Sequence, residues 1–116
     1  MKLPNAHLAE ISQEKVIDYL LCPWHRNGGP KCRFFHPFGF SRDSWDVFAQ
    51  ALKLHAQTLE VRESRTSPFG VSFSIDGPMP TPDGREANVR SVWFVTSSDP
   101  IPRLVTAYPA PDPDNA

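Results

Sequence analysis

Six side chains are of the types that cleave a phosphodiester bond. Two lie in a predicted loop and four in the last two predicted strands. The six are His25, Lys31, Arg90, Arg103, Thr106 and Tyr108. RNA cleavage through the neighbouring 2′-hydroxyl needs a group that moves protons and cations that stabilise charge on the phosphate. His25 is of the residue type best suited to proton transfer as acid or base, because an unperturbed imidazole changes charge near neutral pH. The set indicates metal-free phosphodiesterase chemistry.

The other five residues would hold the substrate. Lys31 offers a point charge, and Arg90 and Arg103 offer a planar fork that matches phosphate. Thr106 and Tyr108 can donate hydrogen bonds, and the Tyr108 ring can stack on a base. Taken singly, each side chain also fits an ordinary structural role, such as an arginine in a surface ion pair. The prediction depends on several of them facing one sheet.

The same loop offers a metal site as an alternative. Cys22-x-x-His25 and Cys32-x-x-x-His36 supply two thiols and two imidazoles, a set that tetrahedral zinc accepts. Pro23 interrupts the first pair and Pro37 directly follows the second, and the intervening loop is shorter than in the usual zinc finger. The preferred interpretation is therefore free cysteines beside solvated histidines, with no cofactor.

A third hypothesis is a non-catalytic binding module. An exposed edge strand, predicted over residues 58–64, could accept a strand from a partner protein. The same sheet could instead dock a small neutralising protein. This interpretation needs no catalytic group.

Composition limits the broad class. The chain has 116 residues, 40% hydrophobic and 22% charged, which is typical of one soluble domain. We expect a single domain over residues 1–109 and a disordered, Pro/Asp-rich tail over 110–116. No apolar run is long enough for a membrane span or a signal peptide, so we expect a cytoplasmic protein that does not associate with membranes. The net charge of −1 excludes a general nucleic-acid coat.

Hydrophobic spacing predicts two helices in the first half of the chain. The first begins at the N-cap Ser12 and ends before Pro23. The second begins at Ser41 and repeats apolar residues at helical intervals. Residues 22–40, between them, are rich in Pro and Gly and are predicted to form a loop.

The second half alternates with a period of two and predicts four strands. They cover residues 58–64, 69–75, 88–96 and 101–108. Three prolines in residues 76–85 are expected to keep that segment out of the sheet. In the closing hairpin, Trp93, Val95 and Val105 are assigned to the core. The predicted fold class is α+β, with two N-terminal helices followed by a four-stranded antiparallel meander.

Four motifs carry a resemblance to a known family. They are Leu3-Pro4-Asn5-Ala6, the helix Lys15–Leu21, the loop His25–Phe35 and the ending Pro102–Pro109. With them the chain resembles an uncharacterised group of short bacterial domains, a domain-of-unknown-function family. Arg26, Cys22 and Cys32 depart from the family pattern. Two of the four potential zinc ligands are thus particular to this chain, which argues against a zinc site common to the family.

The order of helices and strands also resembles the superfamily of barnase, EndoU, colicin-type nucleases and RelE. Similar domains form the toxic tips of larger bacterial proteins or are encoded beside small partner genes. The resemblance implies a toxin-type endoribonuclease that acts on RNA and is neutralised by a small protein. It implies an acid/base role for His25, a phosphate clamp of Lys31, Arg90 and Arg103, and substrate orientation by Thr106 and Tyr108. The alternative is the accessory or immunity half of such a pair.

Overall fold

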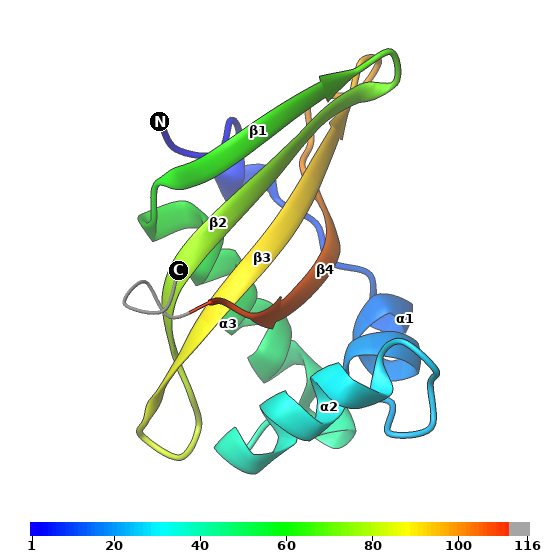
Figure 1. Cartoon of the computed structure of the whole chain (residues 1–116), viewed down its shortest axis with the longest axis vertical. Coiled ribbons are helices and arrows are strands. Elements are labelled where there is room, and N and C mark those ends of the chain that lie inside the picture. Colours follow the sequence, from blue (N-terminus) through cyan, green and yellow to red (C-terminus); the bar gives the residue numbers. More distant parts are fainter. Residues whose placement is uncertain (112–116) are drawn as a thin grey trace.

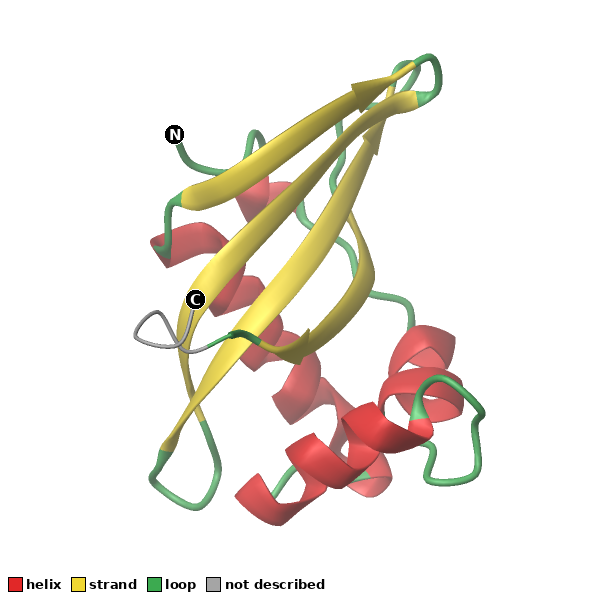
Figure 2. Cartoon of the chain, in the orientation of Figure 1, coloured by secondary structure: helices red, strands yellow, loops and turns green. Residues whose placement is uncertain are grey.

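The computed structural model, which describes residues 1–111, contains a four-stranded antiparallel sheet with helices on one face and beside one edge (Figures 1 and 2). Its strands are β1 (Val61–Ser67), β2 (Gly70–Pro80), β3 (Glu86–Thr96) and β4 (Arg103–Pro109). They lie in chain order across the sheet, each antiparallel to the next. The predicted α+β class and the predicted meander are confirmed.

Three helices precede the sheet in the chain. They are α1 (Gln13–Lys15), which continues into the π-helical segment η2 (Val16–Leu20), then α2 (Gly29–Phe35) and α3 (Trp45–Thr58). Short 3-10 turns lie at Ala6–Leu8 (η1), His36–Phe38 (η3) and Arg42–Ser44 (η4). Ser12 is the N-cap of α1, as predicted, because its Oγ accepts a hydrogen bond from the Lys15 amide at 3.1 Å.

Helix α2 lies inside the segment that was predicted as a loop, so the expectation of only two helices is wrong. Pro30 stands in the first turn of α2, where the missing proline N–H has no partner to lose. Phe35 is fully buried, and its ring centroid lies 4.8 Å from that of Phe48 on α3. Contact with α3 thus stabilises a helix too short to form on its own.

The core lies between α3 and the inner face of the sheet. Helix α3 crosses behind the strands in Figure 1 and packs mainly on β2. Phe48 and Leu52 from α3 are buried together with Ile75 and Trp93 from the sheet. The apolar residues that repeat along α3 and along the strands therefore face the same core, which is why both kinds of element could be predicted.

Strand β2 extends through the proline-rich segment that was expected to lie outside the sheet. Pro78 and Pro80 pair with β3, and Met79 between them is fully buried. Strand β1 begins opposite Ile75, so the part of β2 that follows Ile75 pairs with β3 alone. On this open edge a proline nitrogen needs no hydrogen-bond acceptor.

A β-bulge in β4 changes the face to which its side chains belong. Val92 pairs with Thr106, but the next residue, Trp93, pairs with Leu104, which leaves Val105 without an opposite residue. Val105 is 40% exposed, so its assignment to the core is wrong. Trp93 is fully buried, as predicted.

The bulge has a consequence for the candidate site. Strict alternation would place residue 103 on the face opposite to residues 106 and 108. Because the bulge inserts one residue, all three pair with outward-facing positions of β3. The outer face of the sheet therefore carries Arg90, Arg103, Thr106 and Tyr108 together.

The end of the described chain continues the sheet for one residue. The Ala110 amide donates to the Asn88 carbonyl oxygen at 3.0 Å. Residues 112–116 of the predicted tail lie outside the described residues. Within residues 1–111, no helix is long and apolar enough to cross a membrane.

Candidate functional site

Tyr19, on η2, is the residue through which the loop reaches the sheet. Its hydroxyl forms a hydrogen bond of 3.0 Å with Thr106 Oγ1 on β4. Its ring meets the His25 ring edge-on, with centroids 5.0 Å apart. Lys31 Nζ lies 5.4 Å from the centre of the same ring. Three of the six predicted side chains thus touch one tyrosine that sequence reasoning did not select.

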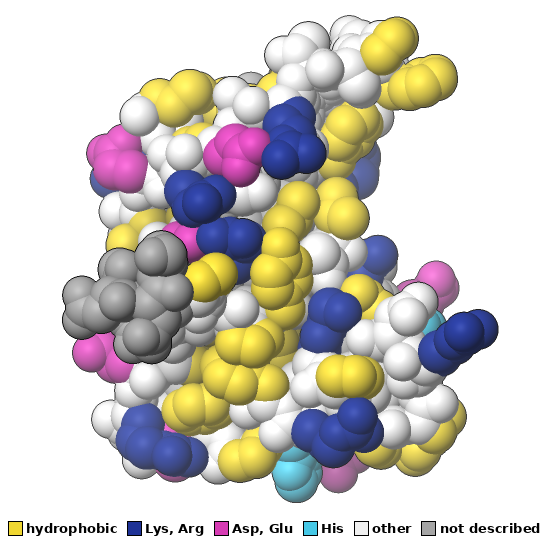
Figure 3. All heavy atoms as spheres, in the orientation of Figure 1, with side chains coloured by type: hydrophobic (Ala, Val, Ile, Leu, Met, Phe, Trp, Pro, Cys, Tyr) yellow, Lys and Arg dark blue, Asp and Glu magenta, His cyan; other side chains and the backbone are white. Residues whose placement is uncertain are grey.

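A fourth predicted residue lies beside this group. Tyr108 and Lys31, with Pro30 and Pro109, line an open cleft of about 420 Å³. The cleft adjoins the outer face of the sheet, which the helices leave uncovered. Figure 3 views this face and shows a stripe of hydrophobic side chains with lysines and arginines on both sides.

Close packing of the loop against η2 holds His25 and Tyr19 together. A Cβ on Gly28 would lie 1.9 Å from the Tyr19 carbonyl oxygen, so only glycine permits this approach. The close neighbour of Gly28 is thus the backbone of η2. The Leu21 amide bonds the Val16 oxygen at 2.8 Å, the spacing of a π turn, which is common at functional sites.

The hydrogen bonds of His25 select one tautomer. Its Nδ1 accepts from the backbone amides of Asn27 at 3.0 Å and Gly28 at 2.9 Å. Because both partners are donors, the proton of the neutral ring is assigned to Nε2. The described residues offer Nε2 no hydrogen-bond partner, and the side chain is half-buried. His25 therefore presents an Nε2–H that can donate a hydrogen bond to a ligand.

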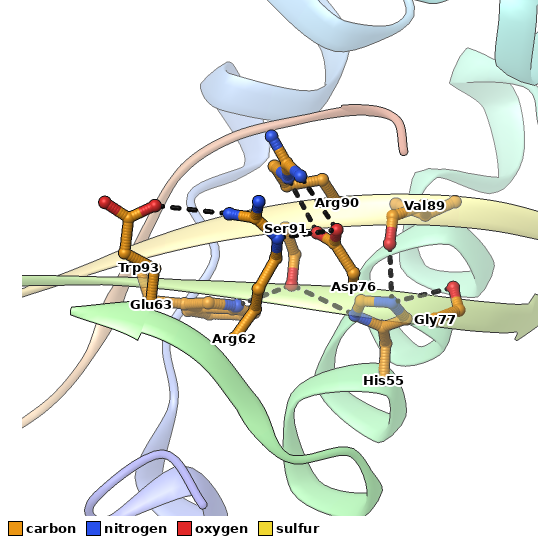
Figure 4. Close-up of polar contacts among 9 residues, drawn as sticks. All are labelled: His55, Arg62, Glu63, Asp76, Gly77, Val89, Arg90, Ser91 and Trp93. Carbon is orange, nitrogen blue, oxygen red and sulfur yellow. Dashed lines mark hydrogen bonds and ion pairs between the residues drawn. The ribbon is translucent and has the colours of Figure 1, made fainter. Parts of the chain in front are cut away.

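Arg90 is committed to a carboxylate. Its Nε and Nη2 donate to the two oxygens of Asp76 at 2.7 and 2.8 Å, and Arg62 Nε approaches the same carboxylate at 3.4 Å (Figure 4). These hydrogen bonds to Asp76 raise the pKa of Arg90 above its usual range, against the opposing effect of burial. The guanidinium also lies 6.0 Å from the centre of the Tyr108 ring. The charge of Arg90 is therefore already paired with the Asp76 carboxylate in the absence of a substrate.

Arg103 is balanced in the same way, at the start of β4. It pairs with Asp99 at 3.0 Å and with Glu10 at 3.3 Å. The hydrogen bond to Asp99 is the main reason that its pKa is raised. No contact described here joins Arg103 to Tyr19, so the structure does not bring it into the group around that residue.

The four potential zinc ligands are not assembled. Cys22 and Cys32 are free and buried, whereas His36 is exposed. Within residues 1–111, no three His, Cys, Asp or Glu side chains gather in a way that could hold a metal ion. Burial, followed by the neighbouring Cys22, raises the pKa of the Cys32 thiol, which keeps it protonated near neutral pH.

A second polar network, centred on His55 of α3, is buried behind the sheet (Figure 4). The Trp93 indole donates to Ser91 Oγ at 2.9 Å, and Ser91 Oγ lies 3.0 Å from His55 Nδ1. The Nε2 of His55 lies 3.1 Å from the Gly77 oxygen and 3.0 Å from the Val89 oxygen. A neutral ring protonated on Nε2 satisfies every contact. The network joins α3 to β2 and β3 and has a structural role.

The place of His55 in the sequence carried a signal of this network. His55 falls on the buried side of α3, among the positions that carry Phe48, Leu52 and Ala56. A histidine at such a buried position must form hydrogen bonds with other buried groups.

We expect the stability of the protein to fall below about pH 6.5 because of His55. Burial lowers its pKa, and the weaker effects of the Gly77 and Val89 carbonyls oppose the shift. At these pH values His55 binds a proton in the unfolded chain but not in the folded chain, so the free energy of unfolding decreases as pH falls. The expected slope is up to about 1.4 kcal/mol per pH unit until the lowered pKa is reached. Urea denaturation from pH 8 to pH 5 measures it, and His55→Leu should flatten this part of the profile.

The fold has a counterpart among solved structures. A chain of a contact-dependent growth inhibition toxin–immunity protein complex from Klebsiella pneumoniae 342 superposes with a TM-score of 0.74 at 15% identity. The superposition covers 92% of this chain and 97% of that one, so the two share a fold over nearly their whole length. No curated protein matches the sequence. Residues 2–111 match the family described as a domain of unknown function, DUF6883, and the chain belongs to that family.

Proposed function

We propose that this chain is a toxin-type endoribonuclease that needs no metal ion. The contact of Tyr19 with His25, Lys31 and Thr106 carries the proposal, because it joins a hydrogen-bond donor, a cation and a hydroxyl from three separate elements. A tyrosine whose only role is packing does not require contacts with these three groups. The presence of Tyr108 on the adjoining cleft adds a ring on which a base can stack.

The chemistry proposed is transesterification within the RNA. The 2′-oxygen attacks the phosphorus and the bond from phosphorus to the 5′-oxygen breaks, which leaves a cyclic 2′,3′-phosphate and a 5′-hydroxyl. The Nε2–H of His25 donates a hydrogen bond to the departing 5′-oxygen, which takes its proton from water, and the 2′-hydroxyl proton passes to water. Lys31 stabilises the charge that develops on the phosphate, while Thr106 and Tyr108 orient the strand.

The comparison with known structures supports a role in such a system at a coarser level. The similar chain belongs to a complex of a growth inhibition toxin and its immunity protein. A toxin or an immunity role for this chain agrees with that likeness, and both roles include a protein partner.

One observation favours the second candidate, a non-catalytic protein-binding module. The outer face of the sheet carries a network of ion pairs that involves Arg62, Glu63, Arg65, Asp76 and Arg90. Phe69, at the tip of the β1–β2 hairpin, is 76% exposed. A balanced polar surface beside an exposed aromatic side chain is typical of a face that docks a protein.

Expression in a bacterial host separates the two candidates. The wild type should arrest growth and fragment cellular RNA, whereas a His25→Ala/Lys31→Ala double variant should accumulate harmlessly. A His7→Ala/Lys2→Ala variant makes the same changes in exposed residues distant from Tyr19 and should behave as the wild type. Harmless accumulation of all three proteins would contradict the enzyme and favour the binding module. Growth curves and RNA electrophoresis give the result.

A further inference from the structure

Two lysines, and not the arginines, bring uncompensated positive charge to Tyr19. Lys15 Nζ lies 5.3 Å and Lys31 Nζ 5.4 Å from the centre of the Tyr19 ring. Within residues 1–111 neither ammonium forms an ion pair with a carboxylate. Arg90 and Arg103, in contrast, are each paired with acidic side chains.

The two lysines come from different elements. Lys15 precedes Tyr19 by one helical turn, so their side chains are neighbours on the helix surface. Lys31 stands on α2 and donates to the Asn27 carbonyl oxygen at 3.1 Å, which holds its ammonium beside the His25 loop. Both side chains are half-buried. Their position is therefore set by the same packing that brings His25 to Tyr19.

An aromatic ring attracts a cation but does not neutralise it. Two ammonium groups without carboxylate partners leave the region around Tyr19 positive, although the chain as a whole is slightly acidic. Two neighbouring positive charges attract an anion more strongly than a single lysine does. The ligand that fits is a polyanion with repeated single charges.

We propose that Lys15 acts with Lys31 to bind the phosphates of an unpaired RNA strand beside Tyr19, in place of the arginine clamp. The inference rests on the proposed function and names the substrate-binding cations of the same site. An unpaired strand is favoured because the Tyr108 ring, across the cleft from Lys31, needs an unstacked base. Lys15 is then a substrate-binding residue that sequence reasoning missed.

The test measures how RNA binding depends on salt. A fluorescent single-stranded RNA oligonucleotide is titrated with protein carrying His25→Ala, which prevents cleavage, at about 50 to 200 mM KCl. On this background, Lys15→Gln and Lys31→Gln should each weaken binding about tenfold at the lowest salt. Each should also reduce the slope of log affinity against log salt by about 0.7, the value for one phosphate contact on a single strand. Lys15→Arg should retain the slope, and Lys2→Gln is the matched control for loss of one charge.

A purely structural lysine gives a different result. If Lys15 only supports the helix through the Tyr19 ring, Lys15→Gln lowers the free energy of unfolding and leaves the salt slope unchanged. An unchanged slope, or one that responds to Arg90→Gln and Arg103→Gln instead, would overturn the inference while RNA cleavage by the wild type continued. If the wild type neither binds nor cleaves RNA, the proposed function fails and the inference fails with it.

Discussion

Replacing His25 by alanine is expected to lower the rate of RNA cleavage by about two to three orders of magnitude. The reason is that the His25 Nε2–H is the hydrogen-bond donor placed beside Tyr19, and the negative charge that develops on the leaving 5′-oxygen would then lose its stabilisation. The change should not affect folding, because the side chain is half-buried and makes its two hydrogen bonds within its own loop. Single-turnover cleavage of a labelled RNA oligonucleotide measures the effect.

Two further variants make this result specific. His7→Ala removes an exposed histidine elsewhere and should cleave at the wild-type rate. Tyr19→Phe keeps the ring beside His25 but loses the hydrogen bond to Thr106. We expect it to lower cleavage by about tenfold, because one neutral hydrogen bond positions the groups without taking part in proton transfer. Equal rates for His25→Ala and the wild type would remove His25 from the mechanism.

Replacing His55 by leucine is expected to lower the free energy of unfolding by about 4 kcal/mol. Leucine leaves the carbonyl oxygens of Gly77 and Val89 without a donor and the Ser91 hydroxyl without its acceptor. Each lost partner in this buried site costs about 1–3 kcal/mol, and the extra apolar surface recovers part of the sum. Urea denaturation at pH 7 measures the loss, with His7→Leu as the exposed control.

Ser91→Ala tests whether the network acts as a unit. Ser91 Oγ links the indole of Trp93 to the imidazole of His55, so its loss should weaken both contacts. In a double-mutant cycle, the effects of His55→Leu and Ser91→Ala should fall short of additivity by about 1 kcal/mol or more. Fully additive effects, or a loss below about 1 kcal/mol for His55→Leu, would show that the network contributes little.

The fold could be predicted for the elements whose hydrophobic residues repeat regularly and face one common core. Helix α3 repeats apolar residues at helical spacing and β3 buries alternate residues, because both face the same core. Helix α2 could not be predicted in this way. It has only seven residues, with glycine and proline at its start, and contact with α3 stabilises it. The prolines of β2 were misjudged because their place in the sheet depends on β1 beginning opposite Ile75, which leaves that edge of β2 open.

The candidate site divides in the same manner. The residue types pointed to His25, Lys31, Thr106 and Tyr108, since imidazole, ammonium and hydroxyl groups carry their chemistry with them. The arginines looked equally suitable, but both have carboxylate partners: Asp76 faces Arg90 from the adjacent strand β2, and Arg103 pairs with Asp99 nearby in the chain and with Glu10 in the N-terminal segment. The type of a side chain therefore indicated whether it can bind phosphate. Only its partners in the structure showed whether its charge is already paired with a carboxylate.

The sequence by itself determined the helix and strand periods, the meander order and the kinds of chemistry available, because these depend on residues close together in the chain. The tertiary structure decided which of those residues meet. Tyr19 joins the loop to β4 through a contact 87 positions apart in the chain, and the bulge at Val105 turns Arg103 to the face of Thr106. Neither leaves a local pattern, since a long-range contact and a register shift are set by packing between elements and not by the residues within one.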